Sequence, residues 1–141
     1  MKRSVLVAVG GALLLLLTTS VTALEIHHIH GLAVDPANPE ILYVATHDGL
    51  IRGEGGRWSL VGEHRADYMG FALHPGTPGL MAASGHPPAG AGEPNPVGVI
   101  VSRDDRRTWR PLALEGQADF HVMALSPADG DTLYGWSVGP R

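Results

Sequence analysis

The sequence predicts an all-β fold built from repeated antiparallel units, and three observations lead to this prediction. Glycine and proline, 19 and 11 residues, make up 30 of the 141 residues, a share that favours turns over long helices. Hydrophobic residues make up 44% of the chain, enough to form the core of one ordinary domain. Short apolar runs bounded by turn residues recur along the chain, which is typical of β-hairpins.

An internal repeat sets the spacing of these units. Segments 28–36, 67–75 and 119–127 align without gaps, and each ends in a proline. The three prolines are 39 and 52 residues apart, which brackets the period of about 40 to 45 residues of a four-stranded propeller blade. A short turn and a second apolar run follow each proline, so each unit is predicted to begin with a β-hairpin.

The second half of a unit is clearest at residues 102–109, SRDDRRTW. This string resembles the Asp-box, S-x-D-x-G-x-T-W, a hairpin motif in which the Ser and Asp side chains bind turn amides and the Trp packs beneath. Arg106 stands where the motif has Gly, a position that favours positive φ, so we expect Arg106→Gly to leave stability unchanged or raise it. The positions that match are predicted to be structural: Ser102, Asp104, Thr108 and Trp109.

The first unit keeps only Trp58 of this motif, and the second unit carries a Gly/Pro-rich insertion at 85–96. Trp58 and Trp109 are both predicted to pack against their hairpins.

Taken in order, six strings resemble one family: HIHGLAVDP, LYVATHDGL, DYMGFAL, ASGHP, the Asp-box and ADFHVMAL. The resemblance, over 25–136, is to the exported bacterial BNR/Asp-box repeat β-propeller proteins described as glycosylhydrolase-like, in the sialidase and sortilin-type superfamily. It implies a partial β-propeller of about two and a half to three four-stranded blades. The implied boundaries are blade one at 24–63, blade two at 64–115 and an incomplete blade three at 116–141.

A partial propeller leaves sheet faces and edges open, and two explanations are compatible with the sequence. The chain is either a fragment of a longer propeller or a unit that associates with further copies of itself to complete a ring.

Residues 1–23 are predicted to be a secretory signal peptide. Lys2 and Arg3 form a positive start, 5–17 is an apolar run, and Val21 and Ala23 supply small residues before a cleavage site. The alternative is an uncleaved membrane anchor, but the run is shorter than the about 20 apolar residues that span a bilayer. We therefore predict export to the periplasm or the extracellular space, with a mature chain of 24–141.

Eight histidines are a high imidazole content, and repeat equivalence predicts that six of them, His27 included, gather on one face. Two residues apart on a strand, His28 and His30 place their imidazoles on the same side, which suits Zn²⁺ or Cu²⁺. The alternative is a structural rim of hydrogen-bonded histidines. The predicted metal ligands occupy three sets of equivalent positions: His28, Asp67 and Asp119; His30 and His121, equivalent to Met69; and His47 and His86.

The remaining histidines and two methionines are predicted to have other positions or roles. His74, equivalent to Asp35 and Ser126, is predicted to be a turn residue on the opposite face, whereas His64 is close enough to the first strand of unit two to join the cluster. Met69 and Met123 are predicted to be core residues rather than soft metal ligands.

Composition narrows the functional classes. A net charge of −4 with 10 Lys and Arg residues argues against nucleic acid, and the absence of Cys excludes disulfides and thiolate chemistry. The favoured function is an exported binding or scaffold module whose His/Asp face takes a metal, a small ligand or a protein. The alternative implied by the resemblance is a sialidase-like glycoside hydrolase, for which no catalytic set is identifiable. A third reading is a non-functional remnant of a longer protein.

Overall fold

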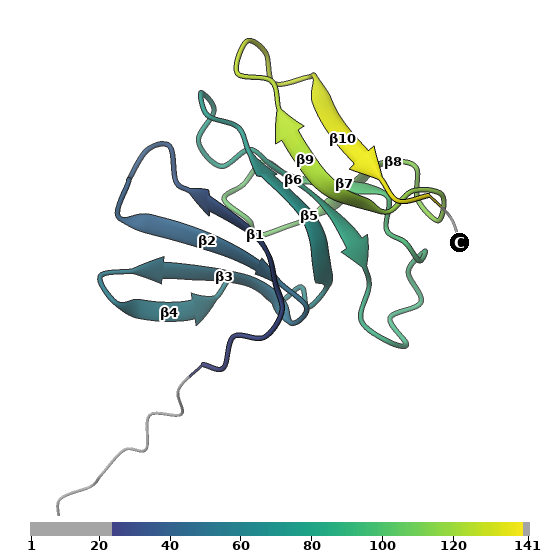
Figure 1. Cartoon of the computed structure of the whole chain (residues 1–141), viewed down its shortest axis with the longest axis horizontal. Helices are drawn as coiled ribbons and strands as arrows, with labels where there is room; N and C mark the ends of the chain where they lie inside the picture. Colours follow the sequence, from purple (N-terminus) through teal and green to yellow (C-terminus); the bar gives the residue numbers. More distant parts are fainter. Residues whose placement is uncertain (1–23, 140–141) are drawn as a thin grey trace, which may run out of the picture.

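A computed structural model describes residues 24–139, which form ten β-strands in three antiparallel sheets (Figure 1). The first sheet contains β1 (Ile29–Val34), β2 (Ile41–Thr46), β3 (Gly49–Glu54) and β4 (Arg57–Leu60). The second sheet contains β5 (Asp67–Leu73), β6 (Met81–His86), β7 (Val99–Ser102) and β8 (Arg110–Ala113). A hairpin of β9 (Phe120–Leu125) and β10 (Leu133–Ser137) forms the third.

The prediction of an all-β fold is confirmed for this part of the chain, which contains strands and turns and no helix. It accordingly holds no helix that could cross a membrane. The predicted signal peptide at 1–23 and the last two residues of the third unit lie outside the described residues.

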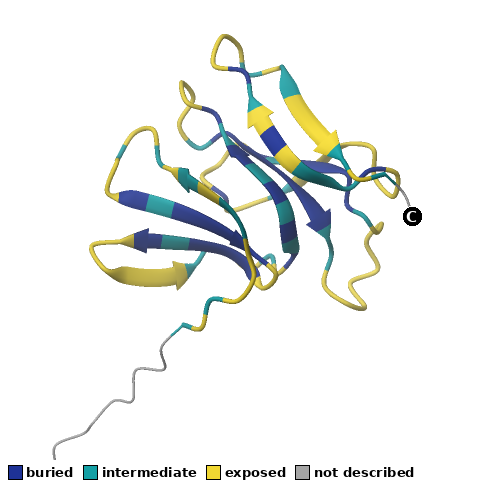
Figure 2. Cartoon of the chain, in the orientation of Figure 1, coloured by how far each residue is buried: buried dark blue, intermediate teal, exposed yellow. Residues whose placement is uncertain are grey.

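The three sheets pack face to face in chain order, with their first strands β1, β5 and β9 side by side (Figure 1). Within each sheet, neighbouring strands follow one another in the sequence. The core between the first and second sheets is the larger and includes Tyr43, Leu50 and Met81, while Ala82 and Met123 lie in a smaller core between the second sheet and the hairpin. Burial is accordingly heaviest in β2, β3, β6 and β7 (Figure 2).

Each first strand carries a β-bulge at the same position of the repeat. In β5, Tyr68 pairs with Gly85 and Gly70 pairs with Ser84, which leaves Met69 as the extra residue. The pairings of β1 and β9 shift in the same way around His30 and His121. A bulge reverses the alternation of side chains, so the residue before it faces the same side as the second residue after it.

The bulge accounts for which residues face which neighbouring sheet. Tyr68 turns with Phe71 toward the first sheet, and Phe120 turns with Met123 toward the second. The equivalent residues of β1 have no preceding sheet among the described residues, and Ile29 and Leu32 are 55% and 62% exposed. At the other end of the row of sheets, the outer face of the β9–β10 hairpin is exposed as well, at Val122, Tyr134 and Trp136.

The turn after each first strand is also repeated. The backbone amides of Asp35, His74 and Ser126 donate to the carbonyl six residues ahead. Their side chains each accept a hydrogen bond from the amide two residues ahead, and His74 does so through Nδ1, 3.0 Å from the Gly76 nitrogen. His74 is therefore a buried turn residue at the far end of β5 from Asp67, as the repeat predicts.

The hairpin between β7 and β8 is held by the side chains of the Asp-box. Ser102 Oγ accepts from the amide of Arg106 at 2.9 Å and donates to Asp104 Oδ1 at 3.1 Å. The Asp104 carboxylate also accepts from the amide and the hydroxyl of Thr108, at 3.0 and 2.7 Å. Trp109 packs against the larger core with its ring 5.5 Å from that of Tyr68. By contrast, Trp58 covers Gly53 in the first sheet but remains 44% exposed.

Arg106 has the positive φ expected at the glycine position, 74°, but its side chain has a role that the motif does not contain. It is buried, with the guanidinium 4.1 Å from the centre of the Tyr43 ring and 3.8 Å from Asp35 Oδ2. These contacts link the hairpin of the second sheet to the core of the first. Burial lowers the pKa of Arg106, and the nearby Asp35 carboxylate offsets this effect.

We predict that Arg106→Gly lowers the free energy of unfolding, contrary to the expectation from the motif alone. Relief of the positive φ contributes about 1 kcal/mol, but loss of a desolvated cation–π contact costs about 2 kcal/mol. The net loss of about 1 kcal/mol should appear in urea unfolding. Arg106→Lys, which keeps a cation on the same backbone, should lose less. Unchanged or increased stability of Arg106→Gly would show that the backbone strain dominates.

A second prediction concerns Asp104, whose pKa is lowered from 3.8 mainly by the hydrogen bond from the Thr108 hydroxyl and then by that from its amide. A lowered native pKa means that this carboxylate stabilises the fold above pH 3.8 and that its contribution is lost as the pH falls through the native pKa. The Thr108→Val variant removes the hydroxyl donor. NMR titration of the Asp104 carboxyl should show its midpoint move upward in this variant, and an unchanged midpoint would contradict the assignment.

Candidate functional site

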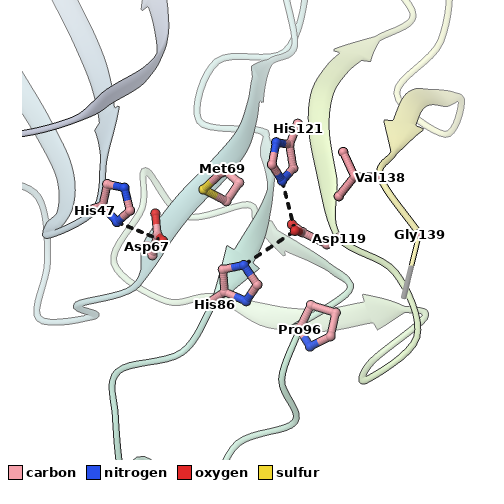
Figure 3. A pocket seen from close by; sticks show the side chains of 9 residues that line it. All are labelled: His47, Asp67, Met69, His86, Pro96, Asp119, His121, Val138 and Gly139. Atoms are coloured by element: carbon pink, nitrogen blue, oxygen red, sulfur yellow. Dashed lines mark hydrogen bonds and ion pairs between the residues drawn. The ribbon is translucent and has the colours of Figure 1, made fainter. Parts of the chain in front are cut away.

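Histidine and aspartate side chains from all three sheets meet around one open pocket of about 430 Å³ (Figure 3). The polar lining comes from the starts of β5 and β9 and the ends of β2 and β6, which lie at the same edge because the strands are antiparallel. Met69, Pro96 and Val138 supply the apolar part of the wall. The polar lining consists of His47, Asp67, His86, Asp119 and His121.

The first polar group joins the first and second sheets. Asp67, at the start of β5, has its Oδ2 3.0 Å from His47 Nδ1 and its Oδ1 3.5 Å from His30 Nε2. One ligand atom from each of these three residues lies within 4.8 Å of the other two. The side chains of His30 and Asp67 are about four-fifths buried, while that of His47 is 43% exposed. This set of two imidazoles and one carboxylate has the composition of a transition-metal site.

His30 is the bulged residue of β1, and its surroundings favour the neutral imidazole. Burial lowers its pKa, Asp67 raises it to a lesser extent, and His47, His121 and His28 lower it further. A neutral imidazole is the form that ligates a metal ion.

The second polar group joins the second sheet and the hairpin. Asp119 Oδ2 lies 3.4 Å from His86 Nε2 and 2.9 Å from His121 Nε2, as the dashed lines of Figure 3 mark. The other ring nitrogen of His86, Nδ1, lies 2.7 Å from Asn95 Oδ1. The pair His86–Asp119 thus repeats, one sheet further on, the pair His47–Asp67.

Several polar atoms of these groups are buried without a hydrogen-bond partner. They include His30 Nε2, Asp67 Oδ1 and Asp119 Oδ1, whereas each buried polar atom normally has a partner in the protein or in ordered water. Both groups therefore contain unused ligand atoms next to the pocket.

The structure thus brings together six of the seven predicted ligands in two His/Asp groups, and the seventh, His28, packs edge-on against His47 with 4.7 Å between the ring centres. His27 does not join them; it is exposed and lies 3.2 Å from Glu25. Met69 differs from its expected core position, because it lines the pocket between the two groups, whereas Met123 is buried in the smaller core. Asn95 was not predicted, since only the folded insertion brings it to His86.

His64 also lies elsewhere, at a second pocket of about 190 Å³ under the β7–β8 hairpin. His64 Nδ1 lies 2.8 Å from the Tyr68 hydroxyl, and its Nε2 lies 3.7 Å from Glu93. Glu115 and Trp109 line the same pocket. Burial raises the pKa of Tyr68, so its hydroxyl stays protonated. The sequence did not predict the contact of His64 with Glu93, because only the folded insertion loop brings Glu93 to this histidine.

Comparisons with known proteins add no assignment to this geometry. No protein-family model matches the chain. A search of curated proteins likewise finds no match.

Proposed function

We propose that this chain is an exported propeller-type binding module that binds Zn²⁺ or Cu²⁺ through His30, His47 and Asp67. The observation that carries the metal site is the convergence of three ligand atoms within 4.8 Å of one another beside an open pocket. The ion would join two sheets, since His30 and His47 belong to the first and Asp67 to the second.

The distances between Asp67 and the two histidines are close to those between neighbouring ligand atoms of a tetrahedral ion. Metal–ligand distances of about 2.0 to 2.1 Å place neighbouring ligand atoms about 3.3 Å apart. The two His–Asp distances are 3.0 Å to Oδ2 and 3.5 Å to Oδ1 of Asp67, close to this value but made to different oxygens of the carboxylate. Three protein ligands leave the fourth position open toward the pocket, where water or a small ligand would complete the coordination.

The propeller part of the proposal rests on the repeat. Each sheet begins with the same bulge, the same turn follows, and β5 and β9 pack their equivalent side chains against the preceding sheet. In a propeller every sheet lies between two others, which accounts for the apolar faces left open on β1 and β10. Further sheets would come from a longer chain or from a second copy. Export rests on the residues of 1–23 alone.

Replacement of His47 by Ala tests the metal site. Isothermal titration of Zn²⁺ into the full chain should show binding. Loss of an outer-shell partner weakens metal affinity by about 10- to 100-fold, and His47→Ala, which removes a ligand, should weaken it by more. His27→Ala is the matched control, because it removes an exposed imidazole outside both groups. Binding should also weaken at acidic pH, since protonated imidazoles do not ligate, and the lowered pKa of His30 places the protonation of this ligand below pH 6.5. Equal Zn²⁺ affinities of His47→Ala and His27→Ala would contradict the metal site and leave a structural rim of hydrogen-bonded histidines as the role of these residues.

A glycoside hydrolase, the alternative function, is favoured by one observation at the second pocket. Glu93 and Glu115 both line it beside Trp109, and two carboxylates at one cleft are what glycosidic hydrolysis requires. If this site is catalytic, the protein should release nitrophenol from a panel of nitrophenyl glycosides, and Glu93→Gln and Glu115→Gln should each abolish the release. Activity that survives both variants, or none in the wild type, would exclude this function for the second pocket.

A further inference from the structure

We infer that the second pocket, under the β7–β8 hairpin, binds a small organic ammonium ion between Trp109 and the carboxylates of Glu93 and Glu115. This inference goes beyond the proposed function and does not rest on the metal site, because it uses other residues of the chain. It is also a different use of this pocket from glycosidic hydrolysis, which requires one of the two carboxyl groups to donate a proton.

Two loops that are distant in the sequence bring the carboxylates to this pocket. Glu93 and Pro94 belong to the insertion after β6, and Glu115 belongs to the turn after β8. The amide of Gly116 donates to the carbonyl of Pro96 at 2.8 Å, which joins the two loops. The two carboxylates are therefore held at one pocket of about 190 Å³.

The charged groups of the pocket favour a cation. The described residues that line it include two glutamates and no lysine or arginine, and His64 is the one basic residue among them. A positively charged ligand would therefore meet attraction from two carboxylates.

His64 directs an N–H toward Glu93. The Tyr68 hydroxyl is buried and stays protonated because burial raises its pKa, and among the hydrogen bonds of the described residues its partner is His64 Nδ1 at 2.8 Å. A buried hydroxyl normally donates its proton, so Nδ1 accepts, and a neutral imidazole carries its own proton on Nε2. This Nε2 lies 3.7 Å from Glu93. The imidazole thus orients the carboxylate without cancelling its charge.

The rest of the wall is aromatic and apolar. Trp109, at the end of the Asp-box, lines the pocket and has its ring 5.5 Å from that of Tyr68. A cation within about 6 Å of the face of an aromatic ring is attracted by its π electrons, and Trp gives the strongest such contact. Apolar walls also strengthen the attraction between an ion and the carboxylates, because they exclude water. The apolar residues of the wall are Pro94, Val97, Ile100 and Pro111.

The size of the pocket indicates the kind of ammonium ion. Its volume of about 190 Å³ is below the about 300 to 1,000 Å³ of pockets for drug-sized ligands, so it suits a head group. Aromatic rings are a recurrent means of recognising quaternary ammonium groups, which carry a charge but no N–H donor. Choline, free or as the head group of a lipid, has this chemistry.

Choline and its uncharged analogue 3,3-dimethylbutan-1-ol test this inference. The two probes have the same shape, and only choline carries a charge. Isothermal titration into the full chain should show choline binding at least about 10-fold more tightly than the alcohol, the ratio expected from the loss of a desolvated cation–π contact. Equal affinities, or no binding of choline, would overturn the ammonium site.

Variants of the two glutamates locate the site. Glu93→Gln/Glu115→Gln should weaken choline binding by about 10-fold, since it removes both carboxylates from a partly enclosed pocket. The matched control, Glu25→Gln/Glu40→Gln, removes the same charge from two exposed residues outside the pocket and should bind choline as the wild type does. Equal losses in the two double variants would show that choline responds to net charge, which would overturn the site.

The fluorescence of Trp109 reports the contact without a change in the core. The chain has three tryptophans, and Trp58 and Trp136 are exposed, so Trp58→Phe/Trp136→Phe leaves Trp109 as the one emitter of this kind. Choline should change its emission with the same midpoint as the calorimetric titration. Unchanged emission at saturating choline would overturn the placement of the ion beside Trp109.

Two further measurements identify the source of the ammonium group and separate this inference from the metal site. Co-sedimentation with phosphatidylcholine vesicles, but not with phosphatidylglycerol vesicles, would assign the pocket to a lipid head group, and binding of choline alone would assign it to a free ion. His47→Ala, the variant that tests the metal site, should bind choline as the wild type does. Loss of Zn²⁺ binding and loss of choline binding can therefore be observed independently.

Discussion

A single extra residue in each first strand determines how the sheets pack and where the site forms. Strict alternation would turn Tyr68 toward the hairpin with Gly70 and Ala72, but the bulge at Met69 turns it toward the first sheet instead. The hairpin approaches Gly70 so closely that a Cβ there would clash with the Phe120 carbonyl oxygen. The bulge thus allows one strand to present a large ring to one neighbour and almost no side chain to the other.

The same bulge aims three equivalent side chains at the pocket edge. His30, Met69 and His121 are the extra residues of β1, β5 and β9, and each lies near the start of its strand. Because the second strand of each sheet runs back antiparallel, His47 and His86 return to this edge and meet the aspartate of the next sheet. The polar groups therefore form at the sheet junctions, where His47 meets Asp67 and His86 meets Asp119.

The Gly/Pro content and the short apolar runs predicted the all-β class, and repeat equivalence predicted the residues of this edge, because alignment of Asp67 with Asp119 and of His47 with His86 depends only on sequence spacing. It did not predict which residues pair, since a His–Asp contact joins different sheets and depends on how these stack. It also misplaced Met69, because a bulged residue leaves the alternation from which a core position is inferred. Arg106 shows the same limit: its positive φ followed from the motif, but its contact with Tyr43 follows only from the packing of two sheets.

The two ends of the repeat show why the polar groups are confined to two junctions. Within the second sheet Asp67 pairs with His86, and in the hairpin the corresponding partner of Asp119 is Val138, whose amide donates to the Asp119 carbonyl at 3.0 Å. Val138 lines the pocket without offering a ligand atom. At the other end, His28 replaces the aspartate and packs on His47. A carboxylate at residue 28 would have no histidine of a preceding sheet to contact among the described residues. The His–Asp pairs between sheets therefore form only where one described sheet packs against the next.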